Sequence, residues 1–270
     1  MELTVLVDNH TFIDEYYLGE PALCIYLEAD GKRVMLDTGY SDIYLKNAEK
    51  MGIDLTKLDT IVLSHGHDDH TKGLEYFPKK DGSIQLLAHP LAFHPKKREP
   101  LSIGCPFSEE ELRGMFQVKL SAEPVRLTEH LWFLGEIPRE NDFENQNPVA
   151  EVLEDGVWKP DYMKEDTALV YEDREGIYVI TGCSHSGICN ICEYAKKVTG
   201  KGRILGLIGG FHLFEEDAEQ IRKTADYLAG EKIGALYPCH CTCFHAKCAI
   251  QNRSKIGEVG VSLHLCWGEE

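Results

Sequence analysis

The sequence predicts an α/β protein whose two halves pack sheet against sheet. The chain has 270 residues, which fits one large α/β domain. No change in composition marks a domain boundary, so residues 1–270 are treated as a single domain. Both halves repeat a coarse order of β-hairpin, helix and a strand that ends in histidine. We therefore expect both sheets to deliver strand ends to one rim.

In the first half, residues 3–7 are apolar and β-branched, which favours a strand. Residues 23–28 and 33–36 read as a hairpin with a turn at residues 29–32. Ser41 and Gly52 have the residue types that begin and end a helix. The remaining elements expected here are a buried strand at 59–63, a strand at 84–88, a helix from a Ser108/Glu111 capping box through Phe116, and a short strand at 131–134.

The second half has clearer periodicity. Residues 167–181 predict another hairpin, with its turn at 173–176. The elements expected after it are helices at 188–198, 215–229 and 246–250 and strands at 203–208 and 235–237. Between the halves, residues 138–164 lack a clear period and contain many charged, Asn and Pro residues, so we expect a long loop or insertion there.

The net charge of −17 excludes several classes of partner. A surface this acidic repels phosphate backbones and anionic lipid, so we expect neither nucleic acid nor a membrane as partner. No apolar run approaches the ~20 residues of a membrane span. Residues 1–8 lack the pattern of a secretory signal. We therefore expect a cytoplasmic protein with reduced cysteines.

The loop after the strand at 59–63 carries four ligand-type side chains within six residues: His65, His67, Asp69 and His70. His65 and His67 are two apart on extended backbone, so both face the same side. Imidazole and carboxylate groups bind catalytic zinc and also iron or manganese. Two such ions about 3.5–4 Å apart can clamp an oxyanion and generate hydroxide near neutral pH. The loop therefore predicts a catalytic centre with two divalent metal ions, zinc first and iron or manganese as alternatives.

Three further histidines, His185, His212 and His240, each follow an apolar strand and a small residue or a short turn. One histidine in this setting is more often structural, but three favour ligands. We expect His185 and His240 to be ligands, and His212 to be either a ligand or a proton donor. Asp37 also ends a strand, and either holds a ligand histidine in one tautomer or begins a turn. Asp69, His212 and Asp37 are the candidate catalytic residues.

Seven of the ten cysteines lie between residues 183 and 248. If the His185 and His240 loops are neighbours, four cysteines could converge on an additional zinc or iron–sulfur centre, with two more beside them. The four are Cys189, Cys192, Cys243 and Cys248, and the two are Cys239 and Cys241. His245 is an alternative ligand. The other interpretation is unligated cysteines that pack as small apolar side chains.

Arg139, His89 and the run Lys96-Lys97-Arg98 are the candidate contacts for an anionic substrate. For the basic run, a solvated loop is the favoured interpretation. For Arg139, contact with an anionic substrate and a solvated position are equally favoured.

The segment from His65 to His70, with Asp37-Thr38-Gly39 upstream, resembles the signature of the metallo-β-lactamase superfamily. The resemblance covers nearly the whole chain and implies a four-layer αββα sandwich. It also implies that His65, His67 and His185 hold one metal ion and that Asp69, His70 and His240 hold the other. The superfamily usually bridges its metals with an Asp from the second half. Residues 182–185 contain no Asp, so we expect His185, His212 or Asp166 to replace it.

The segments at 135–139, 182–185, 208–213 and 240–242 are similar to one branch, the 7,8-dihydropterin-6-methyl-4-(β-D-ribofuranosyl)-aminobenzene 5′-phosphate synthase group. This resemblance implies a hydrolase of an ester, phosphoester or lactone, or a synthase in which pyrophosphate leaves a pterin diphosphate. Both act on a small anionic substrate. The alternatives are a redox protein and a zinc or iron–sulfur binding protein that uses the fold as a scaffold. The flavodiiron branch is a weaker match, because it typically has Glu where His67 stands.

Overall fold

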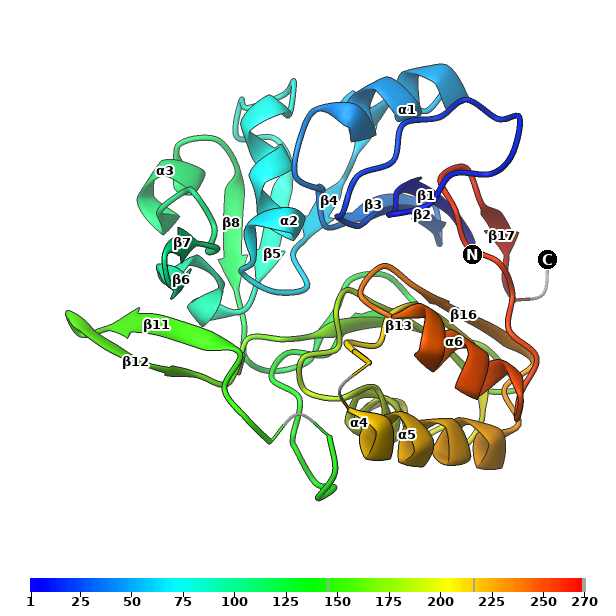
Figure 1. Ribbon diagram of the computed structural model, residues 1–270. Helices are drawn as coiled ribbons and strands as arrows, with labels where there is room; N and C mark the ends of the chain where they lie inside the picture. The colour runs from blue at the N-terminus through cyan, green and yellow to red at the C-terminus, as the bar shows by residue number, and fades with distance from the viewer. Residues whose placement is uncertain (145, 216, 269–270) are drawn as a thin grey trace.

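Two β-sheets face each other and helices cover their outer sides, as Figure 1 shows for the computed structural model. The structure describes residues 1–144, 146–215 and 217–268. The chain is an αββα sandwich, as expected. The first sheet has seven strands in the order β17 (His264–Cys266), β1 (Glu2–Val7), β2 (Cys24–Ala29), β3 (Lys32–Leu36), β4 (Thr60–Val62), β5 (Gln85–Ala88) and β8 (Gln117–Leu120).

The second sheet comes from the second half of the chain. Its six strands run in the order β16 (Ala235–Cys239), β15 (Ile204–Gly210), β14 (Ile177–Thr181), β13 (Ala168–Glu172), β10 (Leu131–Phe133) and β9 (Val125–Arg126). A smaller four-stranded sheet lies to one side in Figure 1, in the order β12 (Val157–Asp161), β11 (Ala150–Glu154), β6 (Lys96–Arg98) and β7 (Leu101–Ser102).

Helices and 3₁₀ turns connect the strands. The first half contains α1 (Ile43–Met51), η1 (Leu55–Lys57), α2 (Asp68–Thr71), η2 (Lys72–Tyr76), η3 (Pro90–Phe93) and α3 (Glu109–Arg113). The second half contains α4 (Ile188–Thr199), α5 (Ala218–Glu231) and α6 (Phe244–Gln251). None of the helices in the described part of the chain has the length and apolar character that crossing a membrane requires.

Three buried clusters correspond to the three interfaces between the four layers. Side chains alternate between the faces of a strand, so each strand contributes to two clusters. In β13, Leu169 packs between the sheets, whereas Ala168 and Val170 pack against the outer helices. In the first sheet, Met35 and Ile61 pack against the helices that include α1. This alternation explains why the apolar strand patterns were readable from the sequence.

The strand directions bring the functional segments to one rim. β3, β4 and β5 are parallel, and so are β14, β15 and β16. The carboxyl ends of neighbouring parallel strands lie at the same edge of a sheet, where α/β proteins place their sites. The loops after β4, β14, β15 and β16 carry the candidate ligand histidines.

Two sequence expectations need correction. Residues 138–164 are not an irregular loop throughout, because the hairpin β11–β12 occupies residues 150–161. The run at 96–98 is not a solvated loop, because it forms β6 and pairs with β7 and β11. Lys96 is buried there, with its ammonium 2.8 Å from Asp161 and 2.7 Å from Glu165. These two carboxylates supply the countercharge that a buried lysine needs.

Candidate metal centre

Seven donor side chains gather at the rim in two sets. The nitrogens of His65, His67 and His185 form the first set, and the donor atoms within it lie within 4.8 Å of one another. The second set meets the same limit and consists of Asp69, His70, Cys183 and His240. Each set combines side chains from both halves of the chain, so the site exists only when the two sheets are packed together.

The first set consists of three imidazoles without polar partners at their facing atoms. Their ring centroids are 4.8–4.9 Å apart. Nε2 of His65, Nε2 of His67 and both ring nitrogens of His185 are buried and accept or donate no hydrogen bond among the described residues. Burial lowers the pKa of His67 to about 4, and that of His65 and His185 well below its usual range. Three neutral imidazoles with free nitrogens are suited to a cation.

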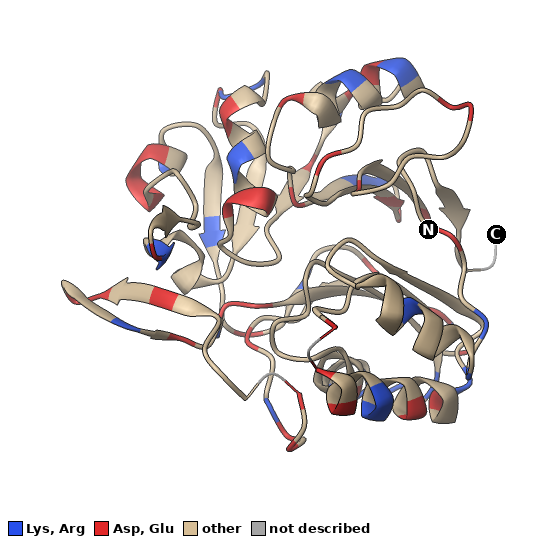
Figure 2. Ribbon diagram, in the orientation of Figure 1, with Lys and Arg blue, Asp and Glu red and all other residues tan. Residues whose placement is uncertain are grey.

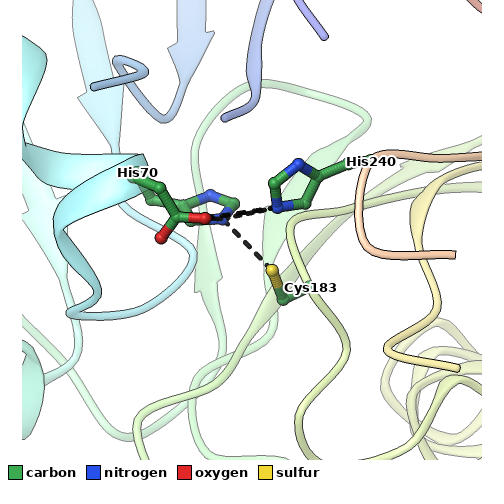
Figure 3. Close-up of side chains that lie close together, drawn as sticks. His70, Cys183 and His240 are labelled. Carbon is green, nitrogen blue, oxygen red and sulfur yellow. Dashed lines mark hydrogen bonds and ion pairs between the residues drawn. The ribbon is translucent and has the colours of Figure 1, made fainter. Parts of the chain in front are cut away.

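In the second set, His70, Cys183 and His240 point toward one another (Figure 3). His70 Nε2 lies 3.1 Å from Cys183 Sγ and 3.2 Å from His240 Nε2. A carboxylate oxygen of Asp69 lies 3.4 Å from Nε2 of each histidine. Burial opposes a charge on His70, but Asp69 and Asp37 outweigh it and hold its pKa well above the usual range.

Cys183 stands where the missing carboxylate was expected. The sequence analysis named His185, His212 and Asp166 as replacements, but the side chain beside Asp69, His70 and His240 is Cys183. Asp166 instead accepts a hydrogen bond from the Ser186 amide at 2.9 Å and so supports the loop that carries His185. The signal was present in the sequence, because Cys183 directly follows the strand and glycine where the superfamily has its Asp.

Hydrogen bonds behind the ligands fix which nitrogen faces the site. His70 Nδ1 lies 2.7 Å from Asp37 Oδ2. The Ser64 hydroxyl donates to the same Asp37 oxygen at 2.6 Å. Because its proton is used there, Ser64 Oγ accepts a hydrogen bond from His65 Nδ1 at 2.8 Å. His240 Nδ1 lies 2.9 Å from Asn9 Oδ1.

Because each Nδ1–H is engaged with an acceptor, the Nε2 lone pairs of these imidazoles point into the site. Two lone pairs 3.2 Å apart, on His70 and His240, repel unless a proton or a cation lies between them. The donor set therefore fits a metal ion.

The backbone is strained where strands deliver these groups. Asp37, Ser184, His212 and His240 all have positive φ values, of 59°, 59°, 47° and 47°. Residues other than glycine rarely adopt this conformation, and it concentrates at functional sites. Gly182 permits the close approach of the two halves, because a Cβ there would lie 2.1 Å from Ser64 Oγ.

His212 lies beside the first set. Its ring centroid is 4.1 Å from that of His185, and its buried Nδ1 has no hydrogen-bond partner among the described residues. It forms a third possible donor group with Cys183 and His185. Both roles expected from the sequence, ligand and proton donor, are compatible with this position.

A cleft of about 680 Å³ opens over both sets. His67, Asp69, Cys183, His185, His212 and His240 all line it. Pro148, Val149 and Phe214 form apolar parts of its wall, and Arg98 is the one Lys or Arg in the lining that the described residues provide. The cleft gives a small molecule direct access to the donor atoms.

The other candidate residues lie elsewhere. His89 is buried, accepts a hydrogen bond from the Leu91 amide at 3.2 Å, and does not line the cleft. The Arg139 guanidinium donates to the carbonyl of Tyr162. His245 is exposed beside Glu215.

The structure does not bring the cysteines together as a separate centre. Cys189 and Cys192 lie on α4 and point into the core, and Cys239 packs between the sheets. Cys243 caps α6, Cys248 is exposed, and Cys241 lines the metal cleft. No group of three or more donor residues found in the described part of the chain contains Cys189, Cys192, Cys243 or Cys248. Most of these cysteines are small core or surface residues, which was the alternative interpretation.

Comparison with known proteins agrees with this geometry. The profile of the family described as the metallo-beta-lactamase superfamily matches residues 18–240, which include both donor sets. The chain belongs to the metallo-β-lactamase superfamily. The resemblance seen in the sequence is thereby confirmed, together with the fold that it implied.

Two proteins of Methanocaldococcus jannaschii are similar to this chain. The chain is 31% identical to an uncharacterized protein, over 96% of this chain and 98% of the relative. It is 32% identical to 7,8-dihydropterin-6-methyl-4-(beta-D-ribofuranosyl)-aminobenzene-5′-phosphate synthase over 83% of this chain and 80% of that enzyme.

Among solved structures, Tm1679, a metal-dependent hydrolase of the beta-lactamase superfamily, matches over the whole of both chains with a TM-score of 0.86 and 28% identity. The metallo-beta-lactamase fold protein YhfI from Bacillus subtilis shares the fold with a TM-score of 0.58 and 13% identity, over 98% of each chain.

Proposed function

We propose that this protein is a metal-dependent hydrolase of a small anionic ester, with phosphoesters as the substrate class. Two metal ions would be held, one by His65, His67 and His185 and the other by Asp69, His70, Cys183 and His240. The main support is that both donor sets, with their unpartnered imidazole nitrogens, lie on one accessible cleft. When bound, two divalent ions stabilise an oxyanion and activate water.

The chain's own residues would prepare the site for that chemistry. Asp37, Ser64 and Asn9 hold three ligand imidazoles in one tautomer and one orientation. The buried positions of His65 and His70 exclude water from the inner side of the centre. His212, beside His185 in the cleft wall, is placed to exchange a proton with a leaving group.

The donor chemistry narrows the choice of metal. Thiolate ligands favour zinc and iron, whereas manganese prefers oxygen ligands. Cys183 therefore supports zinc or iron in the second set, and we propose zinc in both.

A synthase is the second candidate, favoured by the 32% identity to the dihydropterin-type synthase. Both candidates place an anionic group at the metal ions and differ in whether water or another nucleophile attacks. An iron–sulfur or redox role finds less support, because the four cysteines that it would use lie apart.

Hydrolysis of bis(p-nitrophenyl) phosphate by the zinc-loaded protein tests the proposal. We expect zinc-dependent activity that EDTA removes, and a decrease of at least about 100-fold in His67→Ala. The matched control is His130→Ala, since His130 pairs with Asp30 at 3.0 Å and does not line the cleft. Equal activity in both variants would contradict a metal-based hydrolase. Release of pyrophosphate from a pterin diphosphate, without phosphoester hydrolysis, would favour the synthase instead.

A further inference from the structure

The three basic residues of β6 occupy three different environments. Lys96 is buried against Asp161 and Glu165. Lys97 pairs with Glu99 at 2.7 Å and with Glu151 at 3.4 Å. Arg98 is exposed, lines the metal cleft, and pairs with no carboxylate in residues 1–144, 146–215 and 217–268. Figure 2 shows this basic strand in a chain whose outer helices carry many acidic residues. In a protein with a net charge of −17, an unpaired arginine in the metal cleft is available to bind an anionic group of a ligand.

The position of Arg98 relative to the metal loop is fixed by its neighbours. Residues 96 and 98 of a strand face the same side, and Lys96 packs against Gly66, where a Cβ would lie 3.1 Å from Lys96 Cε. The amide of Asp68 donates to the carbonyl of Ile103 at 2.9 Å, and the amide of Ile103 donates to the carbonyl of Lys96 at 3.1 Å. The backbone of β6 is therefore attached to the loop that carries His67 and Asp69.

The rest of the cleft lining contains apolar and aromatic side chains. His212 and Phe214 contact each other edge to face with centroids 4.7 Å apart, and Phe214 is 42% exposed. Pro148 and Val149, which precede β11 beside β6, add further apolar lining. Asp217, which follows Phe214 along the chain, also lines the cleft. The cleft thus offers metal ligands, one cation on β6, and an apolar and aromatic wall.

We infer that Arg98 is a specificity-determining residue that binds a second anionic group of the substrate. This inference rests on the proposed function. The substrate class is a two-ended anion: one oxyanion lies at the metal ions, a ring or short apolar body contacts Phe214, and a carboxylate or phosphate at the far end contacts Arg98. The planar guanidinium presents paired N–H donors to such a group and carries its charge at all physiological pH values.

Two probes that share a ring and a phosphonate test this inference by calorimetric binding to the zinc-loaded protein. Benzylphosphonate has one anionic end, and 4-(phosphonomethyl)benzoate has two. We expect the two-ended probe to bind the wild-type protein at least about tenfold more tightly. Arg98→Gln removes this difference and leaves benzylphosphonate binding unchanged. Lys97→Gln, the matched control, keeps it, because Lys97 does not line the cleft.

Equal binding of both probes to the wild-type protein, with zinc-dependent binding of each, would overturn the inference and leave the proposed function intact. An unchanged preference in Arg98→Gln would overturn it as well. If neither probe binds the zinc-loaded protein, the inference and the proposed function both fail. Unchanged thermal unfolding of Arg98→Gln, which is expected for an exposed side chain, verifies that the variant is folded.

Discussion

Three of the donor imidazoles are held by polar side chains that come from the first half of the chain. Asp37 contacts His70 and Ser64, and Ser64 in turn contacts His65. Asn9 holds His240 from the second half, and the His240 amide donates to Asp8 at 3.0 Å. The imidazoles of His65, His70 and His240 are therefore oriented before any metal arrives, which lowers the entropy cost of binding.

Cys183 gives the first test at this scale. We expect Cys183→Ala to retain clearly fewer than two zinc equivalents, because the second set then loses its thiolate ligand. Cys183→Asp restores the usual carboxylate and retains both. The measurement is the zinc content after dialysis, by plasma mass spectrometry. The control is Cys248→Ala, which removes an exposed cysteine and is expected to keep both zinc ions. Two zinc ions bound to Cys183→Ala would contradict its role as a ligand.

The buried imidazoles predict a pH effect on the chelated protein. Burial lowers the pKa of His67 to about 4, against about 6.5 in an unfolded chain. The unfolded state binds more protons between these values, so the free energy of unfolding falls as the pH falls from about 6.5 to 4. His65 and His185 shift in the same direction, whereas His70 shifts in the opposite one.

Urea unfolding of the EDTA-treated protein between pH 7 and pH 4.5 measures this effect. In His67→Gln the loss of stability over this range is smaller than in the wild type, by up to about 3 kcal/mol. Identical pH dependence in the two proteins would show that His67 titrates normally.

The sequence pointed to six of the seven residues in the two donor sets, and the family resemblance implied the same division between the sets, but Cys183 was not among the expected ligands. Residues 65–70 were recognisable because four ligand-type side chains follow one strand. Cys183 was not predicted as a ligand, because the superfamily has a carboxylate at this place and the neighbouring His and Asp residues were the expected replacements. The hydrogen bonds of Ser64 and Asn9 depend on contacts between distant segments, which no local pattern encodes.

At the scale of elements, the small sheet determines one side of the cleft. β6 is held by the buried Lys96 ammonium, which binds carboxylates from β12 and from the segment that follows it. Burial raises the pKa of Glu165, although Lys96 opposes that shift. The ion pairs of Lys96 with Asp161 and Glu165 therefore link the β11–β12 hairpin to β6, which lies beside the metal loop.

Loss of this lysine is predicted to be costly. Lys96→Met leaves Asp161 and Glu165 buried without their countercharge, which typically costs about 3–5 kcal/mol. Lys97→Met removes only partly exposed ion pairs and costs at most about 1 kcal/mol. Urea unfolding at pH 7 compares the two variants. Similar costs would mean that the buried group contributes little to stability.

Long, regular elements were predictable, whereas several short strands with charged residues were not. The hairpin β2–β3, the Ser108 capping box and α4 lie where the sequence placed them. α5 begins at Ala218 rather than near residue 215. β6, β8 and β11 are short and carry charged residues, so their strand conformation depends on partners elsewhere in the chain.

At the scale of the whole molecule, the metal centre joins the two halves. His65, His67, Asp69 and His70 follow the first sheet, and Cys183, His185 and His240 follow strands of the second. The apolar core between the sheets includes Phe133, Leu169 and Ile208 and holds the two halves in register. The repeated order of elements in the sequence indicated two facing halves, but their relative placement depends on this core.

Metal binding is therefore expected to stabilise the entire fold. At a free zinc concentration about 1,000 times the dissociation constant, the gain is about 4 kcal/mol, which raises the melting temperature by several degrees. Differential scanning calorimetry with and without zinc measures the shift. His185→Ala and His240→Ala, which each impair one set, reduce it. A melting temperature that zinc leaves unchanged would contradict a centre shared by both halves.

Anomalous diffraction from crystals of the zinc-loaded protein tests the central claim most directly. Data collected on both sides of the zinc edge are predicted to show two peaks in the cleft. One lies among the imidazoles of His65, His67 and His185, and the other lies between Asp69, His70, Cys183 and His240. A single peak, or a peak at Cys189 and Cys192 with an empty cleft, would contradict the account.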